Sequence, residues 1–171
     1  MDLGPDDIAG VVDLFGALTR AELQRALSEL AFRQGEDGEP DDFEDAVEEA
    51  IDSYHLVAVP GNAVDGTPGD SAGRDGEADL LVAGPVAFPT LPEAGEDLPH
   101  IMDAPDRAVD REAAAAAAEA QFRADAAAAV GAGDTERVGT LLDVSYELEA
   151  WGPVELDETR RRLDTARDGT N

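Results

Sequence analysis

The sequence contains no lysine and no cysteine. Without cysteine there is no disulfide, no thiolate metal ligand and no cysteine nucleophile. Without lysine there is no Schiff-base amine. A Walker-type phosphate loop is excluded as well, because it needs a lysine to reach the β- and γ-phosphates. Several common classes of enzyme are therefore ruled out by composition alone.

Long apolar runs are also missing. No stretch approaches the roughly 18 residues that a membrane-spanning helix needs. Residues 1–7 are acidic, whereas a signal peptide begins with basic residues. We therefore expect a cytoplasmic protein. The length of the chain predicts one domain, or a small domain with a helical extension.

Acidic residues, in contrast, are abundant. The chain of 171 residues carries 40 Asp and Glu against 12 Arg, a net charge of −28. Such an excess opposes the compact state by self-repulsion, but at 1 M salt the Debye length falls to roughly 3 Å and the repulsion is largely screened. The composition resembles that of small, acidic, uncharacterised proteins of haloarchaea, with K⁺ and Na⁺ held diffusely in the hydration layer. It predicts that folding requires salt.

The first ninety residues contain three amphipathic helical patterns. Apolar residues at helical spacing predict helices over 6–15, 20–33 and 41–54. The second of these begins with the strongest local signal in the chain, a capping box formed by Thr19 and Glu22. Leu18 and Leu23 flank it at the positions of a hydrophobic staple.

Two short apolar segments follow these helices. Residues 55–59 form one, and residues 80–83, continued by 86–88, form the other; both predict strands. We expect them to pair as a hairpin around a Gly- and Asp-rich loop. Three helices followed by a hairpin is the order of elements in a winged helix, so residues 1–90 resemble that fold. The predicted class is α+β, mainly helical, with a winged-helix-like domain over 1–90.

The composition changes from Asp103 onward. Residues 107–130 form an Ala-rich stretch without helix breakers, which predicts a long helix. Two more helices are expected, one capped by Asp134 and a short one running from about residue 156 to Leu163. The sequence thus predicts a linker over 91–104 and an Ala-rich helical extension over 105–168.

The charge pattern bears on what a winged helix could bind. In DNA-binding members the third helix enters the major groove, and phosphate contacts require basic side chains. Here the third helix is acidic, and no Arg occurs between Arg33 and Arg74. A non-enzymatic interaction or adaptor module that binds protein is therefore favoured. The alternative is a transcriptional regulator that binds DNA through its few arginines. The candidate partner-binding residues are Arg20, Arg25, Arg33, Glu44, Glu48, Arg160, Arg161 and Arg162.

One motif suggests catalysis. Residues 69–73 match the G-x-S-x-G nucleophile elbow, with Ser71 as nucleophile, and a serine hydrolase is a minor alternative. The context is unsuitable, because the motif lies in a Gly- and Asp-rich loop rather than between a strand and a helix. The two histidines, His55 and His100, do not stand at a metal-ligand spacing, so no cofactor or metal is predicted.

Overall fold

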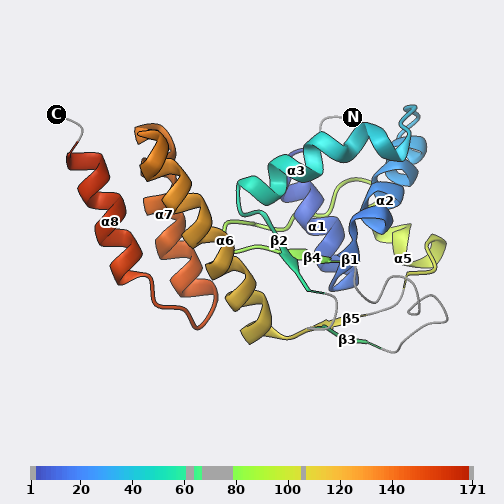
Figure 1. The fold of residues 1–171 in the computed structure, drawn as a ribbon. Helices are drawn as coiled ribbons and strands as arrows, with labels where there is room; N and C mark the ends of the chain where they lie inside the picture. The colour runs from blue at the N-terminus through green and yellow to red at the C-terminus, as the bar shows by residue number, and fades with distance from the viewer. Residues whose placement is uncertain (1–2, 61–63, 67–78, 105–106, 170–171) are drawn as a thin grey trace. The chain divides into compact units, whose positions relative to one another are not determined.

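The computed structural model describes residues 3–60, 64–66, 79–104 and 107–169. The chain divides into two compact units, an N-terminal unit (Met1–Asp110) and a C-terminal unit (Arg111–Asn171). The fold is α+β and mainly helical, as the sequence predicts (Figure 1). Among the described residues, no helix is both long and apolar enough to cross a membrane.

Three helices build most of the N-terminal unit. They are α1 (Pro5–Phe15), α2 (Arg20–Arg33) and α3 (Glu44–Asp52), with a short 3-10 helix, η1 (Pro40–Phe43), before α3. The predicted capping box is confirmed: the Thr19 amide donates to Glu22 Oε2 at 2.8 Å, and the Glu22 amide donates to Thr19 Oγ1 at 3.2 Å. Leu18 and Leu23 are fully buried beside it.

A three-stranded antiparallel sheet packs with these helices. It contains β1 (Leu18–Thr19), β2 (Leu56–Val59) and β4 (Leu80–Ala83) in the order β1-β4-β2. The pairing of β2 with β4 confirms the expected pairing of 55–59 with the run that begins at residue 80. The strand β1 was not predicted, because two residues between helices carry no periodicity.

The predicted continuation of the second strand over 86–88 is wrong. The ladder ends at Ala83, and Pro85 and Val86 form a turn. Proline has no amide hydrogen to donate to a ladder, so it terminates pairing. Beyond Ala83 the Gly84 amide still donates to the carbonyl of His55 at 2.8 Å, and the Val86 amide donates to the carbonyl of Tyr54 at 3.2 Å.

A second, two-stranded sheet pairs β3 (Val64–Gly66) with β5 (Arg107–Val109). Residues 107–109 were predicted to begin the long helix, and this is wrong: α6 begins at Arg111. The strand forms because its backbone pairs with β3, more than forty residues earlier in the chain. Local helix propensity does not include such long-range pairing. Most of the predicted hairpin loop, including Ser71, lies outside the described residues.

Residues 91–104, expected to form a linker, contact the rest of the N-terminal unit. They contain η3 (Gly95–Asp97) and a short helix, α5 (Leu98–Ile101). Leu98 is fully buried in the core of this unit. At the surface, Gln34 Nε2 of α2 donates to the carbonyl of Glu93 at 3.1 Å. Leu98, together with the partly buried Ala94, Met102 and Ala104, thus attaches a segment whose Pro- and Gly-containing composition is typical of linkers.

The C-terminal unit consists of three helices, α6 (Arg111–Ala132), α7 (Thr135–Trp151) and α8 (Asp157–Asp168). The last is longer than predicted and continues past Leu163. In α6 the buried residues are Phe122 and a stripe of alanines, and small side chains let neighbouring helices approach closely. The core is completed from the other two helices by Val138, Leu141, Leu142, Val144, Leu148 and Leu163.

Candidate functional site

The three arginines of α2 differ in their surroundings. Arg20 Nη1 lies 2.5 Å from Glu48 Oε1 of α3. Arg33 lies 3.4 Å from Glu29 Oε1 and 3.3 Å from Asp97 Oδ2. Arg25 is exposed and makes no ion pair with the described residues. The fold therefore uses two of these three arginines to neutralise its own carboxylates.

The outward face of α3 is acidic. Val47 and Ala50 of this helix are fully buried, while its carboxylates face solvent. The exposed acidic residues of α3 are Glu44, Asp45, Glu48, Glu49 and Asp52. Of these, Glu48 forms the ion pair with Arg20. This face therefore presents a dense negative charge to whatever approaches it.

A half-buried ion pair anchors the end of the N-terminal unit to α2. Arg107 Nη1 and Nη2 donate to Glu22 Oε2 and Oε1 at 2.7 and 3.0 Å, and Nη1 also donates to the carbonyl of Ala17 at 3.1 Å. The Arg107 side chain is 16% exposed and the Glu22 side chain is 14% exposed. Burial raises the pKa of Glu22, but hydrogen bonds from Arg107 and the Thr19 amide together hold the pKa below its ordinary value.

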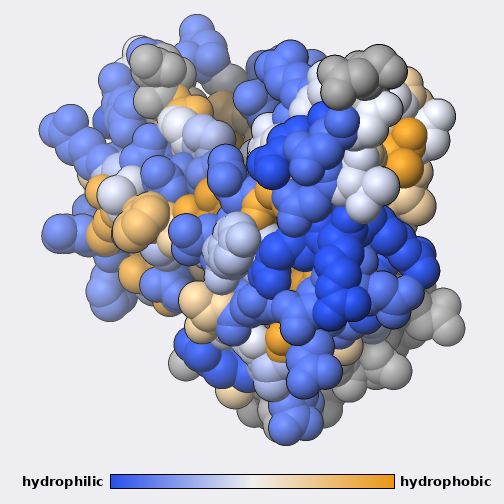
Figure 2. All heavy atoms as spheres, turned by 90° about the vertical axis from the view of Figure 1, so that its left-hand side faces the viewer, coloured by the Kyte–Doolittle hydropathy of each residue, from blue (hydrophilic) through white to orange (hydrophobic). Residues whose placement is uncertain are grey.

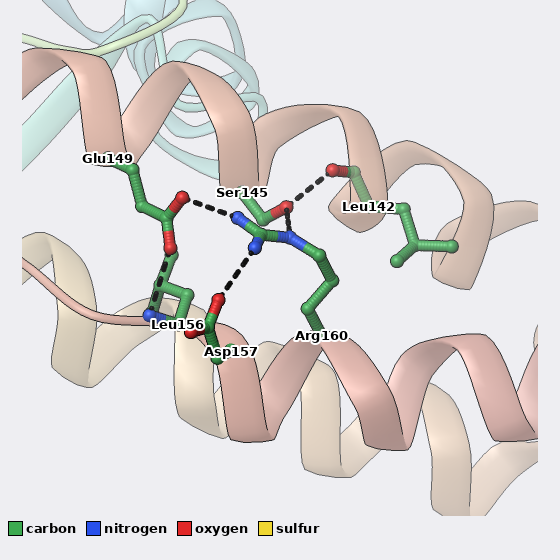
Figure 3. A network of polar contacts seen from close by, with 6 residues as sticks. All are labelled: Leu142, Ser145, Glu149, Leu156, Asp157 and Arg160. Atoms are coloured by element: carbon green, nitrogen blue, oxygen red, sulfur yellow. Dashed lines mark hydrogen bonds and ion pairs between the residues drawn. The ribbon is translucent and has the colours of Figure 1, made fainter.

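Arg160 of α8 is the centre of a second polar network, drawn in Figure 3. Its Nη2 lies 2.6 Å from Glu149 Oε2 of α7, and its Nε donates to Ser145 Oγ at 3.0 Å. Its Nη1 donates to Asp157 Oδ1 at 3.1 Å. All three guanidinium nitrogens thus have partners within the unit, and the Arg160 side chain is only 14% exposed.

The partners of Arg160 are themselves held in place. The buried Ser145 hydroxyl donates to the carbonyl of Leu142 at 2.6 Å, and Glu149 Oε1 accepts from the Leu156 amide at 3.1 Å (Figure 3). The hydrogen bond from Arg160 lowers the pKa of Glu149. The guanidinium also lies 4.3 Å from the centre of the Tyr146 ring, a cation–π contact. Arg160 therefore fastens α8 to α7.

We expect Arg160→Gln to lower the free energy of unfolding by about 2 kcal/mol, because charge-assisted hydrogen bonds to Glu149 and a buried hydroxyl are lost. The measurement is denaturant unfolding followed by circular dichroism at molar KCl. Arg161→Gln is the matched control, since Arg161 is exposed and has no ion pair among the described residues; it should change stability by less than about 0.5 kcal/mol. Equal stability of the two variants would contradict this role for Arg160.

Arg161 and Arg162 differ from Arg160 in that both are exposed. Arg162 Nη2 lies 2.6 Å from Glu158 Oε1 one turn earlier, with both side chains more than 70% exposed. Such surface pairs contribute little to stability. Arg161 and Arg162 are thus exposed where Arg160 is engaged, although the sequence does not distinguish the three arginines.

A serine, a histidine and a carboxylate meet near the end of α3. Ser53 Oγ lies 2.7 Å from His55 Nδ1, and His55 Nε2 lies 3.6 Å from Asp6 Oδ1. Ser53 also donates to the Ala50 carbonyl of its own helix, and Asp6 accepts from the Phe88 amide. These contacts tie α1 and the segment after β4 to the end of α3, which is a structural role.

Two other side chains, those of His100 and Ser71, could take part in catalysis by their chemistry. His100 is exposed, and Ser71 lies outside the described residues. Within the ranges that the structure describes, no group of three His, Asp or Glu side chains is placed to hold a metal ion. The described residues thus present charged surfaces.

These features define a mainly helical α+β protein made of two units. The chain belongs to a family of unknown function, DUF7109, whose sequence pattern matches residues 6–168. Because the match extends through both units, the family comprises the N-terminal and the C-terminal unit together. No curated protein and no solved structure matches the chain.

Proposed function

We propose that this is a cytoplasmic protein of a halophilic archaeon, and that its winged-helix-like N-terminal unit binds another protein. The order α1, α2, α3 and then the antiparallel pair β2–β4 supports the winged-helix assignment. The charge of −28 supports the halophilic origin. On the face drawn in Figure 2, hydrophilic residues predominate and hydrophobic residues form small, separate groups.

The acidic outward face of α3 carries the proposal. A DNA-binding winged helix places its third helix in the major groove. Basic side chains that contact the phosphates supply much of the affinity for DNA. Glu44 and Glu48 stand one helical turn apart on α3 and would repel phosphates. A protein surface that offers guanidinium, ammonium or amide donors is the complementary partner, since charge-assisted hydrogen bonds to carboxylates are the strong ones.

The competing function is a transcriptional regulator. It would have to use Arg20, Arg25 and Arg33 of α2, or the cluster Arg160–Arg162. Two of the α2 arginines, and Arg160, are already bound to carboxylates of the chain. Arg160 is largely buried in its pair with Glu149. The carboxylates of Glu48 and Asp97 beside Arg20 and Arg33 would repel phosphates, which weakens this alternative.

Affinity capture at molar KCl tests the proposal, with captured protein and DNA both sequenced. We expect the wild type to retain a stoichiometric protein partner, and Glu44→Gln/Glu48→Gln on α3 to lose it. The control is Asp143→Asn/Glu147→Gln, which removes the same charge from exposed positions of α7 and should retain the partner. Recovery of specific DNA fragments, lost on replacing Arg20, Arg25 and Arg33 with Gln, would instead establish the regulator.

A further inference from the structure

An open groove lies between α6 and α8 of the C-terminal unit. The helix α7 packs against both of them, and on another side α6 and α8 leave a hollow of 670 Å³ between them. On α6 the groove runs from Arg123 to Gly131, and on α8 from Glu158 to Ala166. At 1.5 Å per residue this is roughly 12 Å of each helix, the length of about two helical turns.

The floor of the groove is mainly apolar. On α6 it is formed by Ala126, Ala127 and Val130, which stand at the spacing of one helical face. Val130 is 40% exposed although it is the largest aliphatic side chain there. From α8 the floor receives small side chains, Thr159, Thr165 and Ala166. Small side chains on both walls let another backbone approach closely.

The charged residues at the rim of the groove are mainly basic, whereas the protein as a whole is strongly acidic. Arg123, Arg161 and Arg162 line it, and Glu158 is the one carboxylate among the described residues that do so. The whole chain has 40 acidic residues and 12 basic ones. Three arginines face Glu158 and, beside Arg123, Glu119, so the rim keeps a small excess of positive charge on a strongly negative molecule.

These arginines are available. Arg161 has no ion pair among the described residues. Arg123 pairs with Glu119 and Arg162 with Glu158, each one turn away on its own helix. Exposed pairs of this kind are worth a few tenths of a kcal/mol, so a partner's carboxylate readily replaces them.

We propose that this groove binds an amphipathic helix of a partner protein, whose apolar stripe is flanked by Asp and Glu. The apolar stripe fills the groove by helix-in-groove recognition, and the carboxylates contact Arg123, Arg161 and Arg162. At 1 M salt long-range attraction is screened to roughly 3 Å, so the arginines act through direct, bidentate contacts that fix the position of the helix. The proposal is independent of the function assigned to α3.

A synthetic peptide probes the groove. It carries Leu at helical i, i+3, i+4, i+7 spacing with Glu on both flanks, and a fluorophore at one end. Two further peptides keep the leucines and replace every Glu by Gln or by Lys. Titration of the full-length protein at molar KCl, followed by fluorescence anisotropy, should give saturable binding of the Glu peptide. The Lys peptide should bind at least about tenfold more weakly, since an unpaired like charge at an interface costs several kcal/mol.

Two variants locate the binding. Ala127→Glu places a carboxylate on the exposed floor of the groove and should weaken the Glu peptide by at least about tenfold. Ala128→Glu makes the same change at the next residue, which is exposed and does not line the groove, and should leave affinity within about twofold. Arg161→Gln should weaken the Glu peptide by about threefold to tenfold and leave the Gln peptide unchanged, because a direct charge-assisted contact is lost.

Several results would overturn the proposal. They are failure of the Glu peptide to bind at millimolar concentration, equal loss of affinity in Ala127→Glu and Ala128→Glu, and equal binding of the Lys peptide. Light scattering adds one more: a wild-type dimer that becomes monomeric with Ala127→Glu would show that a second copy of the chain fills the groove. Circular dichroism of each variant at molar KCl verifies that its helices are intact.

Discussion

Transfer from molar KCl to dilute buffer is expected to abolish most of the helical circular dichroism of this protein. The chain has a net charge of −28, and the described ion pairs are mostly exposed pairs that contribute little. Without salt the Debye length rises from roughly 3 Å at 1 M to about 30 Å at 0.01 M. The carboxylates then repel one another across the molecule. This repulsion raises the free energy of the compact state above that of the expanded state.

A titration measures this effect. Ellipticity at the helical band should rise cooperatively as KCl increases, and should fall again on dialysis. Sucrose in place of KCl is the control, because it favours burial without screening charge; it should restore helicity only in part. Full helicity in dilute buffer would show that the core outweighs the charge repulsion.

Loss of Arg107 should produce the largest effect of any single charge. In Arg107→Gln the Glu22 carboxylate, 14% exposed, loses both bonds of its bidentate partner. Removing one partner of a fully buried pair typically costs about 3 kcal/mol or more. The loss here should approach about 3 kcal/mol, because the Glu22 carboxylate is partly buried and is left with the hydrogen bond from the Thr19 amide. We expect the midpoint of denaturant unfolding at molar KCl to fall accordingly.

Arg111→Gln is the matched control for this substitution. Arg111 is exposed, stands four residues later, and has no ion pair among the described residues, so its stability change should stay within about 0.5 kcal/mol. The double variant Glu22→Gln/Arg107→Gln should recover part of the loss, since no unpaired charge remains. A loss no greater than that of Arg111→Gln would contradict the role of Arg107.

The same pair predicts a pH dependence. The pKa of Glu22 is lower in the folded protein than its ordinary value. Its contribution to stability is therefore complete above the ordinary pKa and is lost as the pH falls through the folded pKa. The difference in unfolding free energy between wild type and Glu22→Gln should shrink on acidification. Molar KCl keeps the protonation of other carboxylates from masking this difference, because their mutual repulsion is already screened.

Local signals in the sequence were reliable where neighbouring residues decide the structure. The capping box of Thr19 and Glu22 needs partners only three residues apart, and the structure has both hydrogen bonds. Periodicity likewise located α1, α2 and α3, because one buried stripe suffices to define a helix. The candidate arginines were also visible, since composition alone makes a basic residue conspicuous in this chain.

Partners far apart in the chain decided what the sequence did not show. Arg107 begins a strand rather than a helix because β3 and Glu22, more than forty and eighty residues earlier, bind its backbone and side chain. Arg160 and Arg161 look alike in sequence, yet one turns toward α7 and is engaged, while the other faces solvent at the groove.

The sequence by itself determined the class of the protein: the absence of lysine and cysteine, the acidity and the helical periodicity are properties of composition and of neighbours. Only the tertiary structure decided which charges are internal and which are displayed. An ion pair depends on distances of a few ångström between segments that the chain brings together, and the strength of each pair depends on how far burial removes it from water.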